Sequence, residues 1–107
     1  MLDWIQLKDV SQLNEIDTLS FTEEGGIAIF KHSTRCSISS MAKNRLDKGV
    51  SEIPIYYLDL IQYRSISNEI ASRYSIDHES PQLLIIKNGK VSEHSSHNMV
   101  SPNQLSR

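Results

Sequence analysis

IAIFKHSTRCSISSMA, residues 27–42, contains the only cysteine of the chain and decides how the rest is interpreted. Its first four residues form a continuous apolar run, which is typical of a central strand covered on both faces. A polar turn follows, and Cys36 then opens a segment with helical spacing. In the first turn of a helix the backbone N–H groups lack intrahelical partners and favour a thiolate over a thiol. We therefore expect thiol redox chemistry at Cys36.

The length and composition limit the classes of protein to consider. The 107 residues suffice for one core, so we expect a single domain spanning residues 1–107. Thirteen acidic residues nearly balance 11 basic ones, and no basic block appears, which argues against a nucleic-acid partner. Asp3 stands where a signal peptide would carry positive charge, and no apolar run is long enough for a membrane span. We expect a cytoplasmic monomer without a membrane partner, and a lone cysteine suits that reducing compartment.

The first half of the chain predicts alternating elements. Residues 4–7 form a short edge strand or the lead-in to a helix, and an amphipathic helix follows Asp9, ending in a loop at 22–26. The helix that begins near Cys36 ends by Gly49. Its inward-facing side is expected to consist of Ile38, Met41, Ala42 and Leu46.

The second half predicts another parallel strand and then a hairpin. Residues 53–61 are rich in β-branched and aromatic residues, and a helix follows with Ser65 at its N-cap. Asn88-Gly89 within residues 80–91 indicates a β-hairpin, and Pro102 after Ser101 begins a last helix of about two turns. The order predicts an α/β domain with a central mixed sheet, a parallel βαβ half, a C-terminal antiparallel hairpin and helices on both faces. This layout, with a cysteine after the central strand and a proline opening the hairpin, is that of thioredoxin-like folds.

Two long motifs and a dipeptide carry a family resemblance. FKHSTRCSISSMA (30–42), HESPQLLIIKNGK (78–90) and Ser96-His97 resemble the YtxJ-like family of the bacillithiol system, the monothiol bacilliredoxins. The resemblance implies that Cys36 attacks the mixed disulfide between bacillithiol and a client protein. It also implies a cis-proline at Pro81, with Ser80 presenting its backbone to the incoming disulfide. Bacillithiol would then be a co-substrate, bacillithiolated proteins the partners, and no cofactor would be bound.

The residues after the cysteine specify the kind of exchange. Cys36 to Ser39 read C-x-x-S, so the chain has no resolving thiol and the reaction stops at a mixed disulfide on Cys36. Ser37 stands where the family usually has proline, and it adds a backbone donor near the sulfur. Ser39, one turn on, is expected to donate a hydrogen bond to the thiolate, or else to be an ordinary residue of the first turn.

The turn before the cysteine supplies further candidates. Arg35 and Lys31 bring positive charge that favours a thiolate, and Arg35 is also placed to contact an anionic thiol ligand such as bacillithiol. His32 either tunes the thiolate and protonates a leaving sulfur or only completes the turn. Thr34, like Ser33, is a candidate N-cap with a structural role. The spacing of the histidines His32, His94 and His97 and the cysteine matches no standard metal site, so we expect no metal.

Two other functions fit the same pattern. The domain could be a binding module or thiol sensor with little turnover, since Ser37 and the missing second cysteine both depart from an efficient dithiol enzyme. It could also resemble a monothiol glutaredoxin that holds an iron–sulfur cluster through its cysteine and glutathione, although the motif is less similar to that family.

Overall fold

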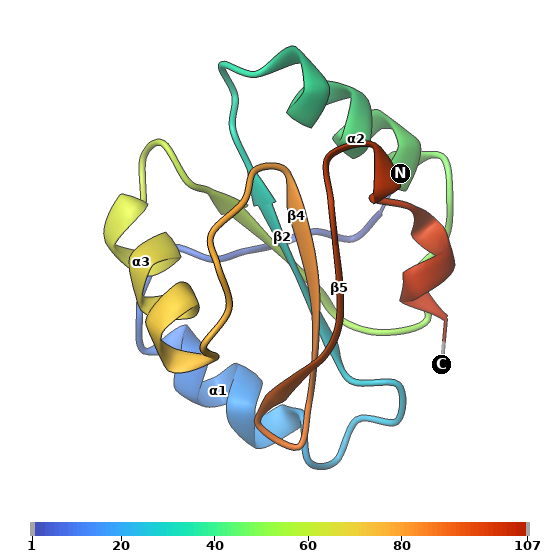
Figure 1. Ribbon diagram of the computed structural model, residues 1–107. Helices are drawn as coiled ribbons and strands as arrows, with labels where there is room; N and C mark the ends of the chain where they lie inside the picture. The colour runs from blue at the N-terminus through green and yellow to red at the C-terminus, as the bar shows by residue number, and fades with distance from the viewer. Residues whose placement is uncertain (1, 107) are drawn as a thin grey trace.

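The computed structural model describes residues 2–106, which form a five-stranded mixed sheet with helices on both faces (Figure 1). The elements are β1 (Ile5–Gln6), α1 (Gln12–Leu19), β2 (Ile27–His32), α2 (Ser37–Asp47), β3 (Ile55–Asp59), α3 (Arg64–Arg73), β4 (Gln82–Lys87), β5 (Lys90–Ser96) and the 3-10 turns η1 (His97–Met99) and η2 (Pro102–Leu105). The strand order is β1-β3-β2-β4-β5. β1 and β2 pair with β3 in parallel, whereas β4 is antiparallel to both β2 and β5. The predicted α/β class and mixed sheet are confirmed.

β2 lies at the centre of the sheet and every one of its residues is buried. Its side chains alternate between the two faces. Ile27 and Ile29 join a core that includes residues of α1 and α3, whereas Ala28 and Phe30 join a second core with Ala42 and Leu46 of α2. The apolar run before the cysteine is therefore a central strand, as predicted.

The hairpin between β4 and β5 turns at Asn88-Gly89. Both residues have positive φ, 53° and 73°, as the two central residues of a type I′ turn require. The hydroxyl of Ser20, just after α1, accepts a hydrogen bond of 2.9 Å from the Gly89 N–H. The hairpin predicted from this dipeptide is thus present and is tied to the end of α1.

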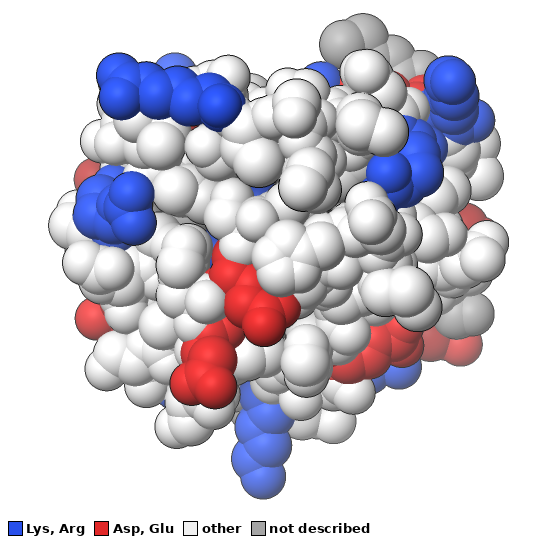
Figure 2. All heavy atoms as spheres, turned by 45° about the horizontal axis from the view of Figure 1, so that its top comes forward, with Lys and Arg blue, Asp and Glu red and all other residues white. Residues whose placement is uncertain are grey.

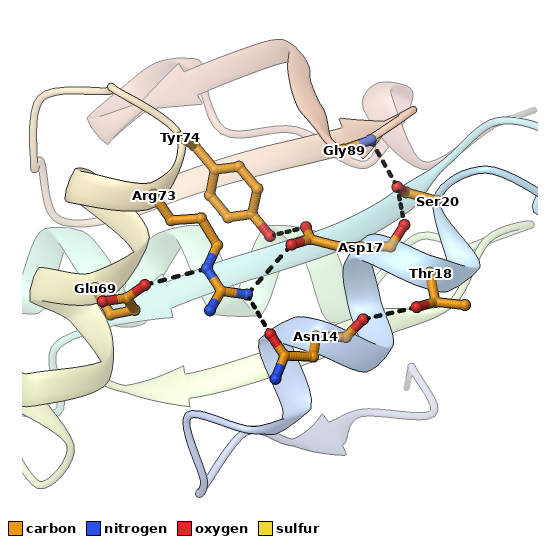
Figure 3. A network of polar contacts seen from close by, with 8 residues as sticks. All are labelled: Asn14, Asp17, Thr18, Ser20, Glu69, Arg73, Tyr74 and Gly89. Carbon is orange, nitrogen blue, oxygen red and sulfur yellow. Dashed lines mark hydrogen bonds and ion pairs between the residues drawn. The ribbon is translucent and has the colours of Figure 1, made fainter.

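A polar network joins α1 to α3 (Figure 3). The Arg73 guanidinium contacts Asp17 at 3.2 Å and Glu69 at 3.1 Å, and the Tyr74 hydroxyl donates to Asp17 at 2.6 Å. Burial of the ring, together with its bond to Asp17, raises the pKa of Tyr74. The same Arg73 also donates to the side-chain oxygen of Asn14. This network fixes the two helices that cover one face of the sheet.

Several predicted boundaries and exposures were wrong. α3 begins at Arg64 with Tyr63 as its N-cap, not at Ser65, and the third strand is shorter than residues 53–61. Ile38 and Met41 are 42% and 58% exposed, so fewer apolar residues of α2 face the core than their spacing predicted. The last helix is a single 3-10 turn at η2. Within residues 2–106 no helix has the length and apolar character needed to cross a bilayer.

Candidate functional site

Cys36 is the N-cap residue of α2 and is partly exposed. Its backbone is extended, with φ −115° and ψ 122°, and its carbonyl accepts the first helical hydrogen bond, 3.0 Å from the Ser40 N–H. The N-cap role expected of Thr34 or Ser33 therefore falls on the cysteine itself. Cys36 thus stands at the N-terminal end of the helix, where negative charge is favoured, although its side chain makes no capping hydrogen bond to the first-turn N–H groups.

A buried cluster on the α2 face holds the turn before the cysteine. The Ser39 hydroxyl, fully buried, accepts a 3.0 Å hydrogen bond from the Ser33 N–H and lies 2.7 Å from His32 Nδ1. The His32 ring stacks on Phe30 and contacts Tyr57. Burial, with a smaller contribution from the Lys43 charge, lowers the pKa of His32, although Asp59 and the Ser39 bond oppose this. Ser39 thus bonds to the turn and to His32 and not to Cys36, and His32 is held in this buried cluster.

The peptide bond between Ser80 and Pro81 is cis. Lys31 pairs with Gln82 across β2 and β4, so Pro81 lies at the same end of the sheet as the turn that leads to Cys36. Ser80 makes no hydrogen bond to the described residues, either through its backbone or through its buried hydroxyl oxygen. We call residues 77–81 the docking segment, because it ends at Ser80 and Pro81, the two residues at which the family resemblance predicts that a substrate disulfide binds.

His97 and Arg45 connect the docking segment to α2. The His97 N–H donates to the Pro81 carbonyl at 3.0 Å, and the Arg45 guanidinium donates at 3.1 Å to the carbonyls of His97 and Val100. His97 has a positive φ of 54°, which few residues other than glycine adopt. Sequence reasoning considered His97 only as a metal ligand and as part of a family motif. Its structural role depends on hydrogen bonds of its backbone, and the type of residue at a position does not reveal such bonds.

Lys31 has a different environment from the one predicted. It is fully buried and points to the face opposite His32, where its Nζ lies 3.2 Å from His78 Nδ1. Burial lowers the pKa of Lys31 to about 8. The charge that was expected near the thiolate instead contacts the docking segment.

The remaining predicted site residues lie at the surface around the sulfur. Thr34, Arg35 and Ser37 are exposed and flank the partly exposed Cys36. Figure 2 turns the end of the molecule that carries the start of α2 toward the viewer. This face is mostly neutral, with separate basic side chains and with acidic side chains near its centre and at its lower right. In residues 2–106 no three His, Cys, Asp or Glu side chains are grouped so that they could hold a metal ion.

Comparison with solved structures identifies the fold. A protein described as having a thioredoxin fold matches with a TM-score of 0.77 and 26% identity, over 95% of this chain and 89% of its own. Fasciola hepatica thioredoxin matches with a TM-score of 0.65 and 17% identity, over 94% and 90%. Malassezia sympodialis thioredoxin matches with a TM-score of 0.63 and 17% identity, over 94% and 82%.

The fold and the lone thiol at the helix N-cap define a monothiol redox protein of the thioredoxin fold. The particular family follows from the sequence. Residues 5–105 match the sequence model of the family described as monothiol bacilliredoxin BrxC, and the chain belongs to this family.

Proposed function

We propose that this protein removes bacillithiol from S-bacillithiolated client proteins by thiol-disulfide exchange at Cys36. The Cys36 thiolate attacks the bacillithiol sulfur of the mixed disulfide. A new S–S bond to bacillithiol forms on Cys36 while the bond to the client sulfur breaks. The client leaves as a thiolate that takes a proton from solvent, so one disulfide is exchanged for another without net oxidation.

The position of Cys36 carries this proposal. Cys36 is partly exposed at a helix N-cap, and the positive end of the helix dipole favours negative charge there, on the attacking thiolate and on the departing sulfur. The chain has no second cysteine, so the adduct persists until a thiol from solution removes it. The exposed Arg35 beside it suits an anionic thiol ligand.

The docking segment supplies the second half of the site. Because the Ser80 backbone is unpaired within residues 2–106, it has a donor and an acceptor for an extended substrate segment that carries the disulfide. Bacillithiol then acts as a co-substrate and bacillithiolated proteins as partners, in the cytoplasm and without a bound cofactor.

The test is release of free thiol from a peptide disulfide-linked to bacillithiol, with the same peptide linked to glutathione as the matched control. We expect release from the bacillithiol peptide, slower release from the glutathione peptide, and none with Cys36→Ser. Equal rates on both peptides would favour the glutaredoxin-like alternative. A bacillithiol adduct that forms on Cys36 but that no added thiol removes would favour the sensor alternative.

A further inference from the structure

Lys31 is a buried charge that the proposed exchange reaction does not use. Its side chain has no measurable exposure, and it follows directly on the apolar run of the central strand. No Asp or Glu in residues 2–106 forms an ion pair with it. Burying an ammonium group without a carboxylate partner is unfavourable for folding. Such a group is therefore expected to serve something other than stability.

The partner of Lys31 belongs to the docking segment. His78 Nδ1 lies 3.2 Å from Lys31 Nζ and also 3.2 Å from the Ser67 hydroxyl of α3. An ammonium group can only donate, so the unprotonated Nδ1 must accept. The Lys31 contact therefore selects the neutral imidazole with its proton on Nε2. His78 itself is exposed, so its ring covers the buried ammonium from the outside.

The rest of the docking segment is held at two more points. The Gln82 side-chain amide, buried at the start of β4, donates to the Asp77 carbonyl at 3.0 Å. The Pro81 carbonyl is bound by the His97 N–H. Between these anchors the backbone groups of His78, Glu79 and Ser80 form no hydrogen bond to the described residues, and the buried Ser80 hydroxyl has no partner among them either. The contacts thus fix the segment on both sides of a short stretch whose backbone is unpaired among the described residues and which ends at Ser80.

We propose that Lys31 is a positioning residue for disulfide exchange, which acts through His78 to hold the docking segment in the conformation that receives the substrate disulfide. This inference rests on the proposed function of the same site. The two last residues of β2 then have separate roles, since His32 fixes the turn that carries Cys36 and Lys31 fixes the segment that faces the substrate.

The contact depends on the protonation state of His78. The charged groups that face this ring are Lys31 from β2, Arg64 from α3 and Glu79 of its own segment. Burial, then Lys31 and Arg64, lowers the pKa of His78, while Glu79 opposes them. Once protonated, the ring would present a second cation to the ammonium at 3.2 Å, and the contact would be lost. Substrate binding should therefore weaken as the pH falls, and the Lys31 charge should set where this happens.

The test compares Lys31→Met, His78→Leu and His78→Asn with the wild type in single-turnover transfer from the bacillithiol peptide to Cys36. Lys31→Met retains the apolar stem, and His78→Asn retains an acceptor near the Nδ1 position. Lys87→Met, at an exposed position of β4, is the matched control. The readouts are the half-saturating peptide concentration, the limiting rate and the dependence of both on pH.

We expect Lys31→Met and His78→Leu to raise the half-saturating concentration about tenfold with little change in the limiting rate, as for a lost hydrogen bond to a charged group. His78→Asn should restore most of the binding. In Lys31→Met the acid loss of binding should also disappear, because the contact that protonation of His78 breaks is already absent, and a loss of folding stability alone would not produce this change. Unchanged binding and an unchanged pH profile in Lys31→Met would overturn the proposal.

Amide hydrogen exchange separates failure of this proposal from failure of the proposed function. If the wild type does not react with the bacillithiol peptide, the proposed function is wrong. The positioning contact still predicts faster exchange in residues 77–81 of Lys31→Met and His78→Leu, with β5 unchanged. Identical exchange in this segment would show that Lys31 does not hold it.

Discussion

Replacing Lys31 with methionine should make the protein more stable. The substitution keeps a long apolar side chain in the buried position and removes the ammonium group. The Ser67 hydroxyl remains within 3.2 Å of His78 Nδ1, so the imidazole keeps a partner. Replacement of a buried charge by an apolar residue of similar volume is often neutral or stabilising.

The size of this gain in stability follows from the lowered pKa of Lys31. Burial lowers the pKa of Lys31 from 10.5 to about 8. At about 1.4 kcal/mol per unit, keeping the group charged in the folded protein costs about 3.5 kcal/mol at neutral pH. Loss of the contact to His78, a hydrogen bond to a charged group, removes about 1.5 kcal/mol of stabilisation. The variant should therefore gain about 2 kcal/mol in free energy of unfolding, or about 8 °C in melting temperature.

The way in which the stability difference between the two proteins depends on pH gives the more specific test. Between pH 8 and pH 10.5 the unfolded chain keeps the proton on Lys31 while the folded chain has lost it. The unfolded state then binds more protons, so wild-type stability gains a contribution that rises with pH across this window. Lys31→Met lacks that contribution, whereas the titrating tyrosines affect both proteins and cancel in the difference.

Urea unfolding of both proteins at a series of pH values tests this reasoning. The difference in free energy should favour the variant by about 2 kcal/mol at neutral pH and shrink as the pH rises through the window. A variant less stable than the wild type at neutral pH, or a difference that does not vary with pH, would refute it.

Three further substitutions follow from the contacts described above. Asp17→Ala removes the acceptor that links both Arg73 and Tyr74 to α1, and should lower the free energy of unfolding by about 1–2 kcal/mol in urea titrations; no loss would show that the network in Figure 3 does not stabilise the fold. Ser39→Ala should slow adduct formation at Cys36, because it frees the preceding turn; an unchanged limiting rate would contradict that role. Gly49→Ala places a Cβ 2.4 Å from the Pro102 Cβ and should lower the melting temperature, measured by circular dichroism; a fully retained melting temperature would show that η2 moves aside freely.

The central strand β2, the turn that leads to Cys36 and the hairpin of β4 and β5 could be predicted because their sequence signals are local. An apolar run followed by polar residues and a helical pattern identified β2 and α2 and placed the cysteine between them. Asn88-Gly89 determined the hairpin because its backbone geometry selects those residue types. Pro81 was found through the family motif. These features need no knowledge of what packs against them.

The network that holds the site could not be predicted because it depends on distant segments. A lysine after an apolar run normally marks the start of an exposed turn, whereas Lys31 is fully buried and contacts His78 of the docking segment, which in turn contacts α3 through Ser67. His78, its partner, lies 47 residues further along the chain. Likewise, apolar spacing cannot show that Ile38 and Met41 lie where no other element covers α2.

The central claim is that Cys36 accepts bacillithiol from a client protein. Intact-mass spectrometry of the protein after incubation with a bacillithiolated client measures this directly. We predict that the chain gains the mass of one bacillithiol on Cys36 while the client loses it, with no gain for Cys36→Ser. A client that keeps its bacillithiol while Cys36 stays unmodified would contradict this claim.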